Sequence, residues 1–305
     1  MNGNFELPPF LHGCFDWRFN GLQWEAPPPI DLLSDAALSD PNPWIVVASV
    51  VERARSGDHA SARRLRDFFE RREPASLNRI ALLVFADTAP NGSLSSLADA
   101  LQSAEPSTRA HAAETAALTG SLSLVPAMLA AWERARSSTD HETIGFALSE
   151  LLEPEPGPIA ESVGSYDLPP PEEPLTPAAR ESYRMVQEAY RDVDSPVLPG
   201  LVREALAAHA GAATAGTALW RAAPYDIRAV ARELLEIARD NRTHVIYDLR
   251  HRFEAFTGID CRPMLHALRL QPLAIAAIGE AFLQSEAARR YEPGVRYFWG
   301  HRIPD

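Results

Sequence analysis

The chain contains 305 residues, of which 46% are hydrophobic and 23% are charged. This composition excludes wholesale disorder, and the length is sufficient for a large hydrophobic core and for more than one structural unit. The only cysteines are Cys14 and Cys261, which excludes a disulfide framework and a paired zinc or redox motif. We therefore expect the protein to work in a reducing compartment, the cytoplasm.

The net charge is −12, and it is distributed unevenly along the chain. Residues 1–150 and 151–195 each carry a net charge of −7, whereas residues 196–305 carry +2. Nucleic acids and anionic membranes repel an acidic protein, so we expect neither as a partner. The longest strongly apolar stretch, Leu273 to Leu283, is too short to span a bilayer, and the N-terminus lacks the basic and apolar regions of a signal peptide.

Residues 1–44 are predicted to form an N-terminal arm, because they are rich in aromatic residues and in proline. The segments 15–19 and 22–24 alternate between apolar and polar residues, and the Asn20-Gly21 pair between them is a preferred two-residue turn. This pattern predicts a small β-hairpin. An isolated hairpin is only marginally stable, so we expect its aromatic side chains to pack on the helices that follow.

Residues 45–153 have the period of successive short helices. Apolar residues recur at i, i+3, i+4 and i+7 in several segments. Two such stripes are Leu77, Ile80, Ala81 and Val84, and Ile144, Ala147, Leu148 and Leu151. The predicted helical hairpins begin near residues 58, 93 and 122, and a repeat of about 30 to 35 residues is typical of an α-solenoid.

The stretch SLSSLADALQSAEPSTRAHAAETAALTGS resembles a HEAT repeat. It has a leucine-rich first helix, a short acidic-proline turn, an arginine that opens the second helix and an alanine-rich face. The stretch LSLVPAMLAAWERARSSTDHETIGFALSELLEP follows the same plan more loosely. The resemblance spans Asp58 to Pro154 and implies a solenoid of helical hairpins, but such solenoids serve many functions.

Residues 154–177 are rich in proline and acidic residues and contain no arginine. This composition disfavours helix throughout and predicts a linker or an extended acidic strap. Residues 178–305 are predicted to form a C-terminal helical domain. Its expected helices cover residues 177–192, 197–210, 213–223, 224–240, 242–257 and 271–290.

The last predicted helix is apolar on almost every side from Leu273 to Leu283, except at Glu280, which predicts a helix buried among its neighbours. The aromatic and arginine-rich tail YEPGVRYFWGHRIPD is expected to pack back on the domain. Taken together, these patterns predict an all-α protein. It would combine a HEAT-like solenoid, a small N-terminal β-hairpin and a C-terminal helical unit.

The sequence contains no arrangement that indicates catalysis. None of the nine histidines pairs with another at i+3 or i+4, and no HExxH motif, glycine-rich phosphate loop after a strand, or nucleophile elbow occurs. HEAT-like metal hydroxylases use repeated His-Glu pairs, whereas this chain has only His141-Glu142. HEAT-like DNA glycosylases need a basic groove, whereas these repeats are acidic. We therefore predict a non-enzymatic protein with no catalytic residues, no metal site and no cofactor.

The segment from Phe256 to Pro304, which closes with RYFWGHRIP, resembles the C-terminal end of a family of all-helical immunity proteins of bacterial polymorphic toxin systems. The resemblance implies a cytoplasmic protein that binds and neutralises a cognate toxin. Two alternatives stay open. One is a HEAT-like enzyme or enzyme-associated factor of the DNA-repair or chromophore-lyase type, and the other is a general protein-binding scaffold.

A tight and fast inhibitor is helped by opposite charge on the two surfaces, so the acidic segments predict a toxin with a basic contact face. The densest acidic stretch and the last helix of the predicted repeats supply the candidate contacts. These residues are Glu142, Glu150, Glu153, Glu155, Glu161, Asp167, Glu172 and Glu173.

Overall fold

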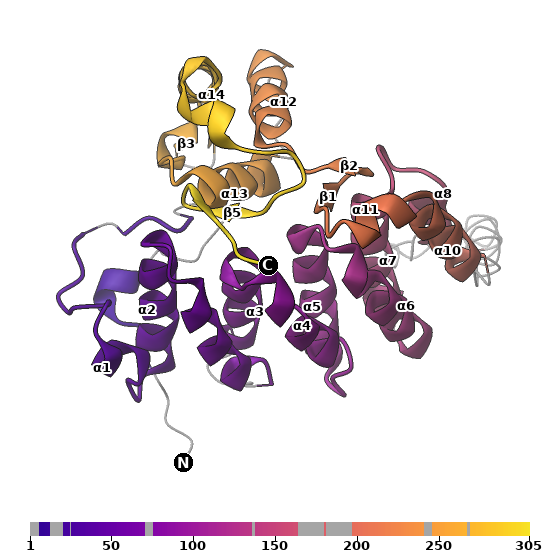
Figure 1. The fold of residues 1–305 in the computed structure, drawn as a ribbon, viewed down its shortest axis with the longest axis horizontal. Coiled ribbons are helices and arrows are strands. Elements are labelled where there is room, and N and C mark those ends of the chain that lie inside the picture. Colours follow the sequence, from indigo (N-terminus) through magenta and orange to yellow (C-terminus); the bar gives the residue numbers. More distant parts are fainter. Residues whose placement is uncertain are drawn as a thin grey trace. The chain divides into compact units, whose positions relative to one another are not determined.

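The computed structural model is mainly helical, with three antiparallel pairs of two-residue strands in the described part of the chain (Figure 1). The structure describes residues 6–12, 21–24, 26–70, 76–135, 138–163, 180, 197–240, 246–266 and 269–305. The all-α class predicted from the sequence is therefore confirmed. The N-terminal hairpin expected around residues 15–25 and the helix expected over 177–192 fall mainly outside the described residues.

The chain divides into two compact units by its internal contacts. Unit 1 comprises Met1–Ala100 and Pro224–Asp305, and unit 2 comprises Leu101–Ala223. This division differs from the four segments expected from the sequence, because the first and last parts of the chain share one core. Local periodicity carries no information on such long-range packing.

Unit 1 begins with helices whose starts are fixed by local capping. Helix α2 begins at Pro43, and the side chain of Asn42 accepts a hydrogen bond from the backbone nitrogen of Trp44 at 3.1 Å. The predicted stripe on α3 is buried, including Leu77 and Val84. The elements of this part are η1 (Pro9–Leu11), α1 (Asp35–Leu38), α2 (Pro43–Arg55), the 3₁₀ helix η2 (His59–Phe68), α3 (Leu77–Thr88), η3 (Asn91–Ser93) and α4 (Ser95–Ala100).

The second part of unit 1 packs α12 on α13 and α14 on α12. Helix α12 buries Ile227, Val230 and Leu234, as its sequence stripe predicts. The elements are α12 (Ile227–Asp240), α13 (Ile246–Thr257), η5 (Arg262–Met264), β3 (Leu265–His266), β4 (Arg269–Leu270), α14 (Pro272–Gln284), η6 (Ala287–Arg290), β5 (Tyr297–Phe298) and β6 (His301–Arg302).

Helix α14 corrects one expectation. The apolar sequence of this helix predicts burial on nearly all sides. In the structure only Ile275, Gly279 and Phe282 of α14 are buried, and Leu273 is 87% exposed. The reason is that its neighbours cover one side only. Gly279 lets α12 approach closely there, since a Cβ atom at this position would lie 2.9 Å from Cδ2 of Leu235.

Unit 2 contains the second half of the predicted repeats. Its described elements are α5 (Pro106–Thr119), η4 (Leu122–Leu124), α6 (Val125–Arg134), α7 (Ser138–Leu152), α8 (Pro158–Val163), α10 (Leu198–Ala208), α11 (Ala210–Thr214) and β1 (Leu219–Trp220). Helices α5 and α7 pack together, and α7 buries the predicted stripe of Ile144, Ala147, Leu148 and Leu151. A buried ion pair of 3.0 Å joins Arg109 on α5 to Asp140 on α7.

Two further expectations in this region are wrong. A short helix, α8, lies within the proline-rich segment 154–177, because Pro158 occupies its first turn, where a missing N–H group is tolerated. The helix expected over 213–223 is replaced by β1, a turn with left-handed residues at Arg221 and Ala222, and β2 (Ala223–Pro224). Tertiary hydrogen bonds favour this turn, since the backbone nitrogen of Arg221 donates to the carbonyl of Glu150 at 3.0 Å.

The C-terminal tail packs back on unit 1, as predicted. Figure 1 shows the yellow tail passing from β5 toward α3. Phe298 is fully buried, and the turn between β5 and β6 is formed by Trp299 and Gly300, both with positive φ. The backbone nitrogen of Trp299 donates to the carbonyl of Ala255 at 2.7 Å, which caps the end of α13.

Arg296 attaches the tail to the C-terminal end of α3. Its guanidinium donates to the carbonyl of Ala89 at 3.0 Å, to Oδ1 of Asn91 at 2.8 Å, and to the carbonyl of Ala86. Burial lowers the pKa of Arg296 to about 10, although the charge of Asp87 opposes this, so the side chain remains charged at neutral pH. The first arginine of RYFWGHRIP therefore caps the C-terminal end of α3.

We predict that Arg296→Met lowers the free energy of unfolding by about 3 kcal/mol, because it leaves buried helix carbonyls without donors. Urea unfolding measures this loss. Arg302→Met is the matched control, because the side chain of Arg302 is 55% exposed and pairs with Glu292 only at 3.8 Å. Equal stability of the two variants would contradict this role of Arg296.

Candidate partner-binding surfaces

The acidic residues predicted to contact a partner have different environments in unit 2. Glu155 and Glu161 are exposed and Glu142 is half-buried, and none of the three forms an ion pair in the described part of the chain. Glu150 is half-buried on α7 and interacts with neighbouring groups. The remaining candidates, Asp167, Glu172 and Glu173, lie outside the described residues and stay predictions.

Glu153 is a correction to the predicted set, because its side chain is buried and has a structural role. Its carboxylate accepts hydrogen bonds from the backbone nitrogens of Ile159 at 2.7 Å, Ala160 at 3.1 Å and Gly157 at 3.3 Å. The hydroxyl of Ser149 donates to it at 2.6 Å. The carboxylate thus satisfies the free N–H groups at the start of α8 and cannot contact a partner.

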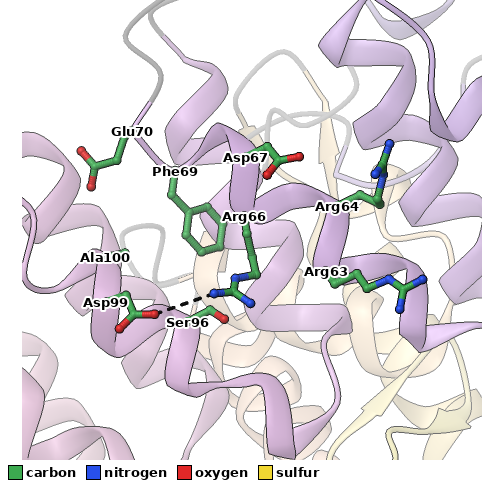
Figure 2. Close-up of a pocket in the computed structure, with 9 residues that line it drawn as sticks. All are labelled: Arg63, Arg64, Arg66, Asp67, Phe69, Glu70, Ser96, Asp99 and Ala100. Atoms are coloured by element: carbon green, nitrogen blue, oxygen red, sulfur yellow. Dashed lines mark ion pairs between the residues drawn. The ribbon is translucent and has the colours of Figure 1, made fainter.

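A second charged feature is an open cleft of about 520 Å³ between η2 and α4 in unit 1. Figure 2 shows Arg66 and Asp99 pointing toward each other, at 3.9 Å, while Arg63 and Arg64 point away from this pair. The cleft is lined by Arg63, Arg64, Arg66, Asp67, Phe69, Glu70, Ser96, Asp99 and Ala100. Three arginines and three carboxylates balance, so the cleft has no net charge with which to select an ionic ligand.

Helix α13 carries a group of buried charged residues in unit 1. They are Arg250, His251, Arg252 and Glu254. Nε2 of His251 lies 2.9 Å from Oδ2 of Asp87 on α3. Burial raises the pKa of Glu254, although Arg250 and His251 oppose this effect, and burial raises the pKa of the Cys261 thiol well above its usual value. Cys261 is therefore a protonated thiol at neutral pH and lacks the thiolate that a nucleophile needs.

The described residues contain no group of three or more His, Cys, Asp or Glu side chains placed to hold a metal ion. Within the same ranges, no helix has both the length and the apolar character required to cross a membrane. Comparisons with protein-family models, with curated proteins and with solved structures give no match to this chain.

We predict that Glu153→Ala lowers the midpoint of urea unfolding of unit 2, with a loss of about 2 kcal/mol, because the start of α8 loses its acceptor. Glu155→Ala is the matched control, since the Glu155 side chain is exposed two residues further on. We expect the control to stay within about 0.5 kcal/mol of the wild type. A surface role for Glu153 would make the two variants equally stable.

The environment of His59 indicates that unit 1 loses stability at acidic pH. This buried ring joins η2 to α3 through a bond of 3.0 Å between Nδ1 and the carbonyl of Thr88. Its pKa is lowered, mainly by burial and further by the charges of His301 and Arg296, while Thr88 and Asp58 oppose the shift. The unfolded chain therefore binds a proton more readily than the folded one, and stability is lost as the pH falls below about 6.5.

We expect His59→Asn to reduce the loss of unfolding free energy between pH 7 and pH 5, because asparagine can donate to Thr88 but does not titrate. The measurement is urea unfolding at both pH values. The exposed residue His12 provides the control variant His12→Asn, which should lose as much stability as the wild type. An unchanged pH dependence in His59→Asn would show that His59 is not the responsible group.

Proposed function

We propose that this protein is a cytoplasmic immunity protein of a bacterial polymorphic toxin system, which binds and neutralises a cognate toxin without catalysis or cofactor. The resemblance of Phe256 to Pro304 to such proteins supports the class. The observation that carries the binding role is the set of carboxylates at Glu142, Glu155 and Glu161, which form no ion pair among the described residues. Unpaired surface carboxylates favour a partner with a basic face.

The structure of the tail limits what the RYFWGHRIP motif can do in this proposal. Arg296 caps α3, Phe298 is fully buried, and Trp299 forms a turn that caps α13. These residues serve the fold of unit 1. The resemblance therefore supports a shared architecture, and the toxin contacts have to come from other residues.

We also propose that the repeats form a HEAT-like solenoid. Arg109, the arginine that opens the second helix of the resembling repeat, donates to the carbonyls of Ser103 at 2.9 Å and Ala104 at 3.1 Å. The same side chain pairs with Asp140 in the following repeat. One arginine thus closes its own turn and attaches the next hairpin, as the stacking of repeats requires.

The test is protection of cells that express the toxin encoded beside this gene, followed by binding kinetics at two salt concentrations. We expect the wild-type chain to protect. The double variant Glu155→Lys/Glu161→Lys should associate about ten-fold more slowly at low salt and show a weaker salt dependence. Glu236→Lys is the matched control, because it reverses an exposed carboxylate on α12 in unit 1.

The outcomes separate the class of protein from the position of its interface. A wild-type chain that does not protect would show the immunity proposal to be wrong. Protection together with normal association of the double variant would leave the class intact and move the interface elsewhere. An enzymatic activity of the purified protein without any partner would favour the HEAT-like enzyme alternative.

A further inference from the structure

An apolar groove lies beside helix α14 in unit 1 and has a volume of about 490 Å³. One wall is formed by Ala277, Ile278 and Ala281 of α14. The rest comes from the end of α13 with the residues that follow it, and from η6 with Tyr291. The lining residues are Thr257, Ile259, Ala277, Ile278, Ala281, Phe282, Ser285, Ala287 and Tyr291.

Two of the three hydroxyl groups in the groove, those of Thr257 and Ser285, are already hydrogen-bonded to the backbone. Oγ1 of Thr257 donates to the carbonyl of Phe253 at 2.6 Å, and Oγ of Ser285 donates to the carbonyl of Phe282 at 2.7 Å. A polar ligand would therefore lose its bonds to water and gain few from these groups. The residues that line the groove therefore favour apolar side chains as ligands. The groove is also large enough for more than one such side chain.

The apolar surface continues from the groove onto the exposed side of α14. Helical residues are rotated by about 100° each, so Leu273, Ala277 and Ala281 lie on one face, next to Ile278. Glu280 lies about 160° from Ile278 around the helix but only about 20° from Leu273, so it stands beside Leu273 on the exposed face. The carboxylate of α14 therefore borders the outer edge of this surface beside Leu273, whereas the groove next to Ile278 is free of it.

The end of the groove formed by η6 is positively charged. Arg289 and Arg290 are both exposed and have no ion pair in the described ranges. The neighbouring carboxylates are Glu286 and Glu292, and Glu292 pairs with Arg302 at 3.8 Å. Arg290 immediately precedes Tyr291, which lines the groove, and its charge opposes the rise that burial causes in the pKa of Tyr291. At the opposite rim, Asp260 and Arg262 neutralise each other at 2.7 Å. A local positive charge is thus left in a chain whose net charge is −12.

We propose that this groove binds an acidic amphipathic helix of a partner protein. Two apolar side chains at i and i+4 of that helix enter the groove beside Ile278, and carboxylates that follow them meet Arg289 and Arg290. Helix binding in an apolar groove commonly uses anchors at this spacing. The site lies in unit 1 and does not depend on the toxin-binding proposal, whose acidic residues belong to unit 2.

The probe is a fluorescein-labelled helical peptide of about 15 residues with leucine at i and i+4 and glutamate in the turn that follows. A second peptide has lysine in place of the glutamates. Fluorescence anisotropy with the full chain should give at least about ten-fold tighter binding of the glutamate peptide. The double variant Arg289→Glu/Arg290→Glu should reverse this preference, and it changes only exposed side chains.

The apolar contact is tested with Ile278→Asp, which should weaken binding of the glutamate peptide about ten-fold or more. Leu283→Asp is the matched control, because Leu283 is equally half-buried but lies on the opposite flank of α14. Circular dichroism and urea unfolding of each variant show whether it is folded. If Ile278→Asp fails to fold, the arginine reversal and the lysine peptide still decide the outcome.

Equal binding of both peptides, an unchanged preference in the arginine variant, or no binding of either peptide would overturn the proposal. A second copy of this chain is the remaining candidate for the groove. Sedimentation of the wild-type chain measures whether it forms a dimer. A dimer that Ile278→Asp dissociates and that Leu283→Asp leaves intact would assign the groove to self-association instead.

Discussion

The burial of charged residues on α13 determines the arrangement of unit 1. A purely apolar helix could pack against many neighbours, but buried charges need specific partners, because an unpaired buried charge is strongly destabilising. His251 meets Asp87 of α3 at 2.9 Å, and Glu254 accepts from the backbone nitrogen of Leu22 at 3.4 Å. Both partners belong to the first hundred residues. Helix α13 is therefore stable only when the N-terminal and C-terminal parts of unit 1 fold together.

The tail strengthens this constraint from the other side. Arg296 caps α3 while the Trp299 turn caps α13, so one short hairpin satisfies the ends of both helices. The guanidinium of Arg55 lies 4.3 Å from the ring centres of both Trp24 and Trp299, which connects the tail to α2 through cation–π contacts. Residues more than 200 positions apart in the sequence thus stabilise one another.

The sequence predicts the local features of this fold well, since the stripes on α7 and α12 depend only on helical period. Features that depend on distant neighbours are missed. The composition of α14 shows its apolar character but not that α12 covers a single side of the helix. Likewise, Glu153 looks like any residue of an acidic run, and only the position of α8 turns its carboxylate into a cap. The groove was not predictable, because three separate segments form it.

The groove and the core of unit 1 share two aromatic rings. Phe282 packs edge-on against Phe253 at 5.0 Å, and Tyr291 packs against Tyr297 of the tail at 5.0 Å, while both Phe282 and Tyr291 line the groove. The floor of the groove is therefore held in place by the docked tail, which keeps the site preorganised. A ligand that binds this floor binds only the folded unit, so it stabilises the docked tail more as its concentration rises above Kd. Stability and binding on this side of the molecule consequently depend on one aromatic cluster.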